Sequence, residues 1–469
     1  MEQDLLTNRN RLAKLLHWPE NIGIEMRDIT IGGDPGLLVW VHGLVRLELL
    51  DMTILPALAS GSASGALPFA EITERLVAHR PRITADLPDA VNAIFAGNLL
   101  VLMDGVAEAL LIDAADFPNH HAQQRSPDPS DDIFGRDARF NLALLRKRLR
   151  DPALIAREVK LKRPRAGLVA LVHMEGRADR RVLRAVRRWL YEHGGEESVQ
   201  RGIPPGAGAV FGAVPCFDSI IWPDKVAGLL STGYVAVIVD RVVAAFVAPV
   251  TAGMAMVAPN DLGLHYPLRR FLVRFRIALH FLVLMLPGVV VALMNYHQEM
   301  IPTSFLIAVA SVRENAPFGV FFEVALAEVV VEMIREATFR LEVHLPIGAA
   351  SIVVVLVFIL VVFAGYLGPL PAIAAALGSI ASLALPDYAG AYMVRIWRYY
   401  LLIAAMLFGF FGMAAVLKLF LVLLCQSRTW GVPFLGPAGL HLTSVETMSS
   451  NRSNRLGGSG RGRKRSVVR

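Results

Sequence analysis

The feature that most constrains the fold of this chain is a long uncharged segment in its C-terminal half. Residues Leu345 to Pro386 contain no Asp, Glu, Lys, Arg or His. About 20 apolar residues are enough for a helix to cross the hydrocarbon core of a bilayer, so this segment is long enough for two crossings. Gly368-Pro369-Leu370-Pro371 lies near its middle and is typical of a turn. The segment therefore predicts a helical hairpin in a membrane.

Two further apolar segments extend this prediction to a whole domain. Phe275 to Met294 carries few charges, and Tyr399 to Cys425 is interrupted by the single charge of Lys418. Hydrophobic residues make up 54% of the chain, more than soluble globular proteins use. We expect a polytopic α-helical membrane domain over residues 266–435, with about four to six helical segments.

The first 250 residues differ in pattern and predict a soluble α/β domain. Short apolar runs typical of buried strands alternate with stretches typical of helices that have a charged face. The strand candidates are Gly36 to Gly43 and Ala166 to His173, and the helix candidates are Arg136 to Arg150 and Arg177 to Tyr191. This alternation favours layered α/β packing, which we divide into subdomains over residues 1–120 and 121–265.

An internal similarity raises the question of a duplication. Gly97 to Asp104 and Gly233 to Asp240 each lead into a second apolar run, and both are predicted to form β-hairpins that turn at or just after the Asp. A duplicated subdomain explains the similarity, but apolar hairpins also resemble each other by chance. Pro118 to Asp132 is polar, contains prolines and is predicted to be a surface loop.

The C-terminal tail carries most of the excess positive charge. Residues 441–469 hold seven Lys and Arg residues against Glu446 alone, which leaves +6 of the +7 formal charge of the whole chain. We predict a disordered basic tail over residues 436–469 that is attracted to anionic membrane lipids. Nucleic acid is not a predicted partner, because the tail lacks the interleaved aromatic residues that stack on bases.

The distribution of arginines predicts the orientation in the membrane. The chain starts with the acidic Met1-Glu2-Gln3-Asp4, which is not a signal peptide. Four arginines lie before or at the start of the first span, and no Lys or Arg lies between Asn295 and Ser304. The soluble domain is therefore expected to face the cytoplasm. One further crossing by Tyr399 to Cys425 would carry the basic tail outside, so either that segment is not a simple single span or the tail is external.

The chemistry of the membrane half is concentrated in one helix between the apolar segments. Glu328, Glu332 and Glu336 follow each other at intervals of four residues and form one acidic stripe on a helix, with Arg335 beside it. Glu323 points largely away from that stripe. Carboxylates in an apolar helix are costly unless they face water or a protein partner, so the stripe is a candidate ion path. The alternative is an amphipathic interfacial helix, with the stripe in water and Arg335 paired with Glu332 or Glu328.

Other candidate features are weaker. The uncharged segment Ile347 to Tyr366 would form a hydrophobic gate in an oligomer or simply pack against lipid. His297 and Glu299 are predicted in an outer loop, but two residues make a poor metal site, so no metal is predicted. The sequence contains no nucleotide-binding, zinc-binding or nucleophile motif between the strands and helices that such motifs require. The two cysteines, Cys216 and Cys425, lie in different predicted domains. Neither an enzymatic activity nor a cofactor is predicted.

Short motifs in both halves of the chain match a known family. In the membrane half they are Leu286-Pro287, Tyr296 to Thr303, Arg313-Glu314, Pro317-Phe318, Glu332 to Ala337, Pro346 to Gly348, Leu385 to Tyr388 and Gly431 to Phe434. In the soluble half they are Ile31 to Gly33, Leu37 to Val39, Asp104-Gly105, Asn141 to Arg146, Leu149 to Asp151 and Gly233 to Asp240. On these residues the chain resembles the A subunits of GerA-type nutrient germinant receptors of endospore-forming bacteria. It departs from that family at Ser126 to Asp131 and at Ile221 to Asp224, which indicates a divergent member. A paralogous germination protein encoded with the SpoVA proteins shares the same architecture, and that subgroup is the alternative.

The resemblance implies a subunit of a receptor in the spore inner membrane, with its N-terminal domain facing the spore core. It implies a transporter-like B subunit and a lipoprotein C subunit as partners, and assembly of the A subunit into a homo-oligomer. The function it implies is a nutrient-gated cation channel that triggers spore germination. The alternatives are a secondary transporter, for which no inverted repeat of broken helices is found, and a non-conducting scaffold subunit of a membrane complex.

Overall fold

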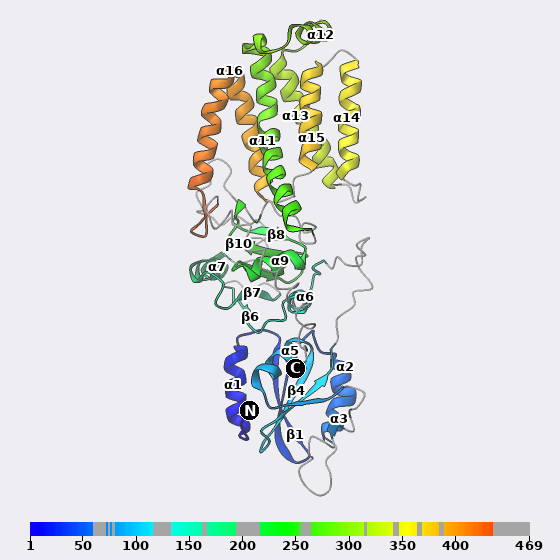
Figure 1. Cartoon of the computed structure of the whole chain (residues 1–469), viewed down its shortest axis with the longest axis vertical. Helices are drawn as coiled ribbons and strands as arrows, with labels where there is room; N and C mark the ends of the chain where they lie inside the picture. Colours follow the sequence, from blue (N-terminus) through cyan, green and yellow to red (C-terminus); the bar gives the residue numbers. More distant parts are fainter. Residues whose placement is uncertain are drawn as a thin grey trace, which may run out of the picture. The chain divides into compact units, whose positions relative to one another are not determined.

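A computed structural model of the chain describes residues 1–59, 72–73, 76, 80–115, 133–161, 167–193, 216–252, 254, 264–313, 317–340, 347–363, 368–383 and 389–434. These residues form two compact units (Figure 1). The α/β unit comprises the described residues up to Pro249, and the helical unit comprises those from Val250 onward. The α/β domain with two sheets and the helical domain with apolar helices are confirmed.

The first half of the α/β unit is a five-stranded antiparallel sheet with helices on both faces. The strand order is β1-β2-β4-β5-β3, formed by Ile24–Ile31, Asp34–Val41, Asn98–Met103, Ala109–Asp113 and Arg82–Thr84. Leu37, Val39 and Val41 of β2 pack on the face that α1 (Leu5–Leu16) and α5 (Leu87–Phe95) cover. Leu38 and Trp40 pack on the other face, with the continuous helical segment formed by α2 (Leu47–Leu49), the π-helical η1 (Leu50–Ile54) and α3 (Leu55–Ala59). Burial on both faces explains the continuous apolar run of this strand.

The second half repeats this arrangement. Its strand order is β6-β7-β9-β10-β8, formed by Leu154–Glu158, Val169–Met174, Val235–Val239, Ala245–Ala248 and Asp218–Ile220. Its helices are α6 (Ala138–Arg148), α7 (Arg180–His193) and α9 (Pro223–Ser231). The predicted strands and helices of the N-terminal region are confirmed, and both predicted hairpins form, as β4–β5 and β9–β10. The predicted loop from Pro118 to Asp132 lies outside the described residues.

Equivalent hydrogen bonds show that the two halves share more than strand order. Asn8 on α1 exchanges two hydrogen bonds with the backbone of Glu2, at 2.6 and 3.0 Å. Asn141 on α6 does the same with the backbone of Gly135, at 2.8 and 2.7 Å. Each asparagine side chain is hydrogen-bonded to both backbone groups of the residue six positions before it. The turn into the first helix of each half therefore has the same hydrogen bonds.

The strand-end aspartates are equivalent as well. Asp104 accepts a hydrogen bond from the N–H of Leu5 at 3.1 Å, and Asp240 accepts one from the N–H of Ala138 at 3.2 Å. Each carboxylate therefore satisfies the first free N–H group of the helix that opens its own half. These matched side-chain hydrogen bonds agree with a duplicated subdomain, and the duplication stays a prediction.

A buried arginine joins the two halves. Arg146 of α6 is 1% exposed, and it donates to Asn21 Oδ1 at 2.9 Å and to the carbonyl oxygen of Ile22. The backbone of Ile22 in turn donates to the carbonyl of Ala156 in β6 at 2.7 Å. Burial lowers the pKa of the Arg146 guanidinium to about 10. The segment before β1 is thereby held against the edge of the second sheet.

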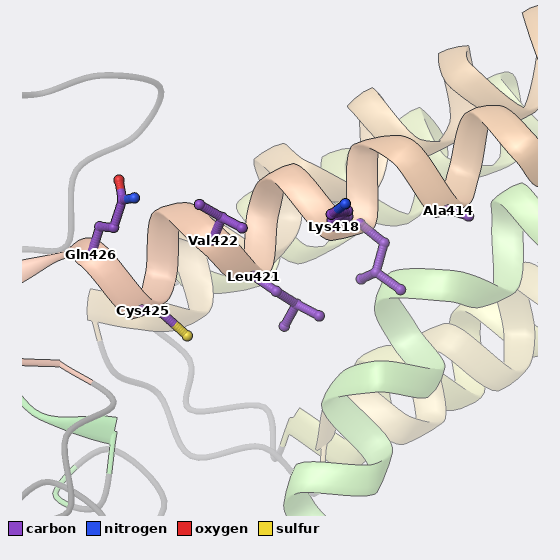
Figure 2. A pocket seen from close by; sticks show the side chains of 7 residues that line it. Ala414, Lys418, Leu421, Val422, Cys425 and Gln426 are labelled. Carbon is purple, nitrogen blue, oxygen red and sulfur yellow. The ribbon is translucent and has the colours of Figure 1, made fainter.

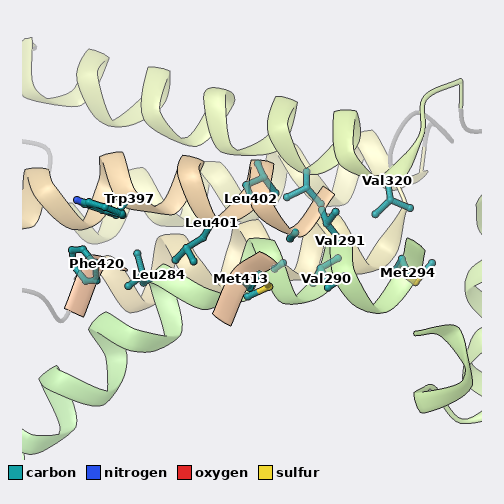
Figure 3. Close-up of a cluster of buried hydrophobic side chains, with 14 of the residues drawn as sticks. Leu284, Val290, Val291, Met294, Val320, Trp397, Leu401, Leu402, Met413 and Phe420 are labelled. Carbon is teal, nitrogen blue, oxygen red and sulfur yellow. The ribbon is translucent and has the colours of Figure 1, made fainter. Parts of the chain in front are cut away.

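The helical unit consists of α11, α12, α13, α14, α15 and α16, which span Tyr266–Tyr296, Thr303–Arg313, Val320–Arg340, Ile347–Phe363, Pro369–Leu383 and Ala389–Gln426. A short η4 turn (Gln298–Met300) follows α11, and a small hairpin of β11 (Arg428–Thr429) and β12 (Val432–Pro433) follows α16. The helical hairpin predicted around Gly368 forms: α15 begins at Pro369, and Val354 and Phe358 of α14 pack in one cluster with α15. Figure 3 shows the larger apolar core, shared mainly by α11 and both arms of α16.

The last helix, α16, reverses direction in its middle. Phe408 and Gly409 are not helical, and Gly409 has φ 57° and ψ −141°. The rings of Trp397 and Phe420, 23 positions apart, lie 4.9 Å from each other. A straight helix would separate them by about 34 Å, so residues 389–407 and 410–426 are antiparallel arms. Of the two alternatives left open for Tyr399 to Cys425, the structure shows that the segment is not a simple single helix.

The reversal brings both ends of the helical unit to one side. Tyr296, at the end of α11, donates its hydroxyl to the carbonyl of Met406 beside the reversal. At the opposite end, Thr429 donates to the carbonyl of Val250 at 2.7 Å, and the N–H of Ala252 donates to Phe434. The start of the unit and the end of α16 are therefore adjacent.

Candidate functional site

The acidic stripe of α13 faces two arginines on the first arm of α16. Arg398 Nη1 lies 2.8 Å from Glu328 Oε2, and Arg398 Nη2 lies 3.9 Å from Glu332 Oε2. Arg395 Nη1 donates to Glu332 Oε1 at 2.8 Å. Two carboxylates and two guanidinium groups thus form a neutral group, which we call the charged cluster: Glu328, Glu332, Arg395 and Arg398.

The charged cluster is buried at one side and open at the other. The side chains of Glu328 and Arg398 are only 3% and 4% exposed, whereas those of Glu332 and Arg395 are 35% and 25% exposed. A charge this deeply buried in an apolar bundle is tolerated only with an opposite charge beside it. The pairing therefore fixes α13 against α16 and makes the contact sensitive to the loss of either partner.

The remaining members of the predicted site lie apart from the cluster. Glu336 is exposed, one turn beyond Glu332 on α13. Arg335 lies on the same helix, but its side chain is outside the described part of the chain. Glu328 faces protein, and its partners come from α16. The ion path remains a prediction, now with arginines next to two of its three carboxylates.

A second ion pair lies toward the other end of α13. Glu323 is fully buried, and it accepts from Arg313 at 3.2 Å and from the N–H of Gly368 at 3.0 Å. As expected, it points away from the stripe. The Glu323 carboxylate links α13 to α12 and to the start of α15. Together with the charged cluster, it gives α13 two sets of ionic contacts with neighbouring helices.

Sequence reasoning missed the three arginines that receive these carboxylates. Arg395 and Arg398 are not among the predicted site residues, and Arg313 is named only as part of the family motif Arg313-Glu314. Their spacing was a usable signal, because Arg395 and Arg398, three residues apart, share one helix face, like Glu328 and Glu332. In an apolar bundle, two such faces of opposite charge are expected to meet.

The predicted outer loop contains a contact but no metal site. His297 Nδ1 lies 3.3 Å from Glu299 Oε1, and the His297 ring stacks on Phe410 at 4.9 Å. Among the described residues, no group of three or more His, Cys, Asp or Glu side chains is placed to hold a metal ion. The loop packs the end of α11 against the reversal of α16.

The helix predicted as a hydrophobic gate presents an apolar face to its surroundings. Along α14, Ile352, Leu356 and Leu360 are 63%, 54% and 69% exposed within the chain. They recur every four residues and form one stripe. This face suits a gate between subunits and contact with lipid equally well, so the prediction stays open.

A shallow groove of about 430 Å³ lies along the second arm of α16 (Figure 2). It is lined by Ala414, Leu417, Lys418, Leu421, Val422, Cys425 and Gln426. The groove is apolar apart from Lys418 and Gln426, and in the described part of the chain Lys418 makes no ion pair. The apolar lining favours contact with an apolar surface over binding of a polar ligand.

Two helices of the described chain are long and apolar enough to cross a membrane: Phe271–Tyr296 and Arg395–Gln426. The second is the folded α16, whose arms are about 28 and 25 Å long. Shorter apolar helices lie at Ile352–Val362 and Pro369–Gly378. These helices support an association with a membrane.

Comparison with known proteins gives a family match over nearly the whole chain. The sequence profile of the family described as "Bacillus/Clostridium GerA spore germination protein" matches residues 10–449. Among solved structures, the N-terminal domain of the A subunit of the Bacillus megaterium spore germinant receptor GerK3 is similar at 19% identity, with a TM-score of 0.42 over 53% of this chain and 96% of that one.

Three of the relatives are spore germination proteins of Bacillus subtilis strain 168. Spore germination protein KA is 28% identical, over 88% of this chain and 78% of its own length. Spore germination protein B1 is 24% identical, over 93% and 92%. Spore germination protein A1 is 25% identical, over 74% of each. The low identities agree with a divergent member, and the chain belongs to the GerA family of Bacillus and Clostridium spore germination proteins.

Proposed function

We propose that this chain is a subunit of a nutrient germinant receptor in the spore inner membrane. The observation that carries the proposal is the family match over residues 10–449, which covers both the α/β unit and the helical unit. The partners proposed from the resemblance are a transporter-like B subunit, a lipoprotein C subunit and further copies of the chain itself. The apolar helices support the membrane location.

The α/β unit and the basic tail are proposed to lie on the cytoplasmic side, toward the spore core. The arginines at the start of α11 support this orientation. The reversal in α16 supports the same side for the tail, because it brings the end of that helix back to the level of Val250. A tail on the cytoplasmic side is the simpler proposal with this reversal, because α16 is then not required to cross the membrane once more.

The receptor is further proposed to conduct cations, with α13 at the border of the path. Glu336 is the exposed carboxylate of the stripe, whereas Glu328 and Glu332 are held by Arg398 and Arg395. Arginines repel cations and mask these carboxylates in the resting arrangement. A movement of α16 away from α13 would expose both carboxylates and lower the barrier for cations, so the charged cluster is proposed to act as the gate.

Spores that carry the chain in variant form test this proposal. The triple variant E328Q/E332Q/E336Q keeps the shape of the side chains and removes their charge. We expect it to reduce nutrient-triggered release of monovalent cations, measured against spores with the control variant Glu25→Gln, which changes an exposed residue of β1. Unchanged release at normal protein levels would exclude the stripe from the ion path. A chain that passes no ions with its partners in liposomes would support a scaffold.

A further inference from the structure

One face of α7 is strongly basic and is not used by the proposed function. The helix has the sequence RRVLRAVRRWLYEH, in which Glu192 is the only acidic residue. Its exposed arginines fall within an arc of about 120° around the helix axis. We call this set the arginine face: Arg180, Arg181, Arg184, Arg187 and Arg188.

The opposite face of α7 anchors the helix in the protein. Val182, Val186, Trp189 and Leu190 are between 0% and 6% exposed, and Trp189 packs on Phe217 with ring centroids 5.4 Å apart. The helix therefore cannot turn its apolar side toward a membrane. Any partner must be recognised by the arginine face as it stands, as a rigid positive surface about 12 Å long.

The arginines of this face have no acidic partner within the described chain. Arg184 donates to the backbone carbonyl of Arg180 at 3.1 Å, which is a contact inside the helix. Asp179, next to the face, accepts from the backbone N–H of Arg181 and so serves the start of the helix. Among the described residues no ion pair offsets the mutual repulsion of these five neighbouring cations, and the exposed Glu192 supplies a single negative charge on the same helix. The net positive charge of this face favours an external anionic surface.

We infer that the arginine face docks on the anionic headgroups of the membrane that holds the helical unit. This inference rests on the proposed membrane location. Ala248 ends the last strand of the α/β unit, and Val250 already belongs to the helical unit. Because so few residues join the two units, the bilayer surface is always present at high local concentration. Each arginine near such a surface strengthens binding about fivefold.

A nucleic acid fits the same face less well. Proteins that bind single strands stack successive bases on several exposed aromatic rings. In the described part of α7 only one ring, Tyr191, is exposed, because Trp189 is buried. Tyr191 is 55% exposed just beyond the last arginine, where an aromatic ring suits the boundary between headgroups and hydrocarbon. The arrangement therefore favours a lipid surface.

The test uses the full chain in nanodiscs of phosphatidylcholine, which carry no net charge. In every protein compared, the basic residues from Arg452 onward are replaced by glutamine, so that the tail does not contribute. Binding to added vesicles of equal parts phosphatidylglycerol and phosphatidylcholine is measured by flotation. We expect the triple variant R181Q/R184Q/R188Q to bind roughly 100-fold more weakly. The matched variant R27Q/R136Q/R139Q, which removes exposed arginines elsewhere in the α/β unit, should bind as the parent does.

Several outcomes would overturn the inference. They are equal binding by both triple variants, binding to phosphatidylcholine vesicles alone, or binding of a DNA duplex in place of the vesicles. The variant R181K/R184K/R188K keeps the charge and should retain binding, which separates charge loss from misfolding. Failure of the proposed membrane location is recognised independently, because the parent chain would then not enter nanodiscs at all.

Discussion

Neutralising Glu328 should lower the free energy of unfolding of the helical unit far more than neutralising Arg395, the more exposed arginine of the charged cluster. In E328Q the guanidinium of Arg398 stays 4% exposed but loses the carboxylate at 2.8 Å and keeps Glu332 at 3.9 Å. Removing one partner of a buried ion pair lowers the free energy of unfolding by about 3–5 kcal/mol. Because Arg398 keeps its contact with Glu332, we expect a loss of about 3 kcal/mol for E328Q. R395Q breaks a pair that is 25% and 35% exposed, for which we expect less than about 1 kcal/mol.

Equilibrium unfolding of the purified full chain in mixed detergent micelles, followed by circular dichroism, measures both values. The double variant E328L/R398M removes both charges and should recover most of the loss, because the site then contains no unpaired charge. Equal costs for E328Q and R395Q, or a cost below about 1 kcal/mol for E328Q, would show that Glu328 and Arg398 are not a buried pair.

Three further predictions follow from other parts of the chain. Gly409→Ala should cost about 1–3 kcal/mol, because φ 57° with ψ −141° suits glycine alone, whereas Gly378→Ala, which meets nothing within 4 Å, should not lower the thermal midpoint. Burial lowers the pKa of His173 from 6.5 to about 4, so only the unfolded chain takes up this proton between those values. Stability should therefore fall as pH drops from 6.5 toward 4, and His173→Leu should flatten the fall in a urea titration. Burial raises the pKa of the Cys216 thiol to about 11, so a maleimide should label the exposed Cys425 of the native chain and both cysteines only after denaturation.

The elements of the fold were predictable where local pattern and tertiary environment agree. The apolar run at Gly36 to Gly43 became a strand buried on both faces, and Gly368-Pro369 marked the start of a helix because proline fits its first turn. The reversal at Gly409 was not predictable in position. It lies within an apolar run whose only turn residues are Gly409 and Gly412. Because glycine is also common inside membrane helices, these two residues do not by themselves mark a reversal.

The sequence predicted the carboxylates of the candidate site but not the arginines that pair with them. The spacing of Glu328 and Glu332 identified one helix face, but it carried no information about what that face meets. The partners Arg395 and Arg398 are more than 60 positions away, and only the folding of α16 against α13 brings them there. The duplication was likewise left open by the sequence. The matched contacts of Asn8 and Asn141 agree with it, and they involve backbone groups that no sequence comparison shows.

The most direct test of the gate is an exchange of charges between Glu328 and Arg398 in spores. Nutrient-triggered release of monovalent cations is recorded for E328R, R398E and the double variant E328R/R398E at matched protein levels. The account predicts that each single variant alters the triggered release and that the double variant, which restores an opposite pair at the same place, regains it in large part. Normal release in both single variants, or a double variant no better than either, would contradict a gate built on this pair.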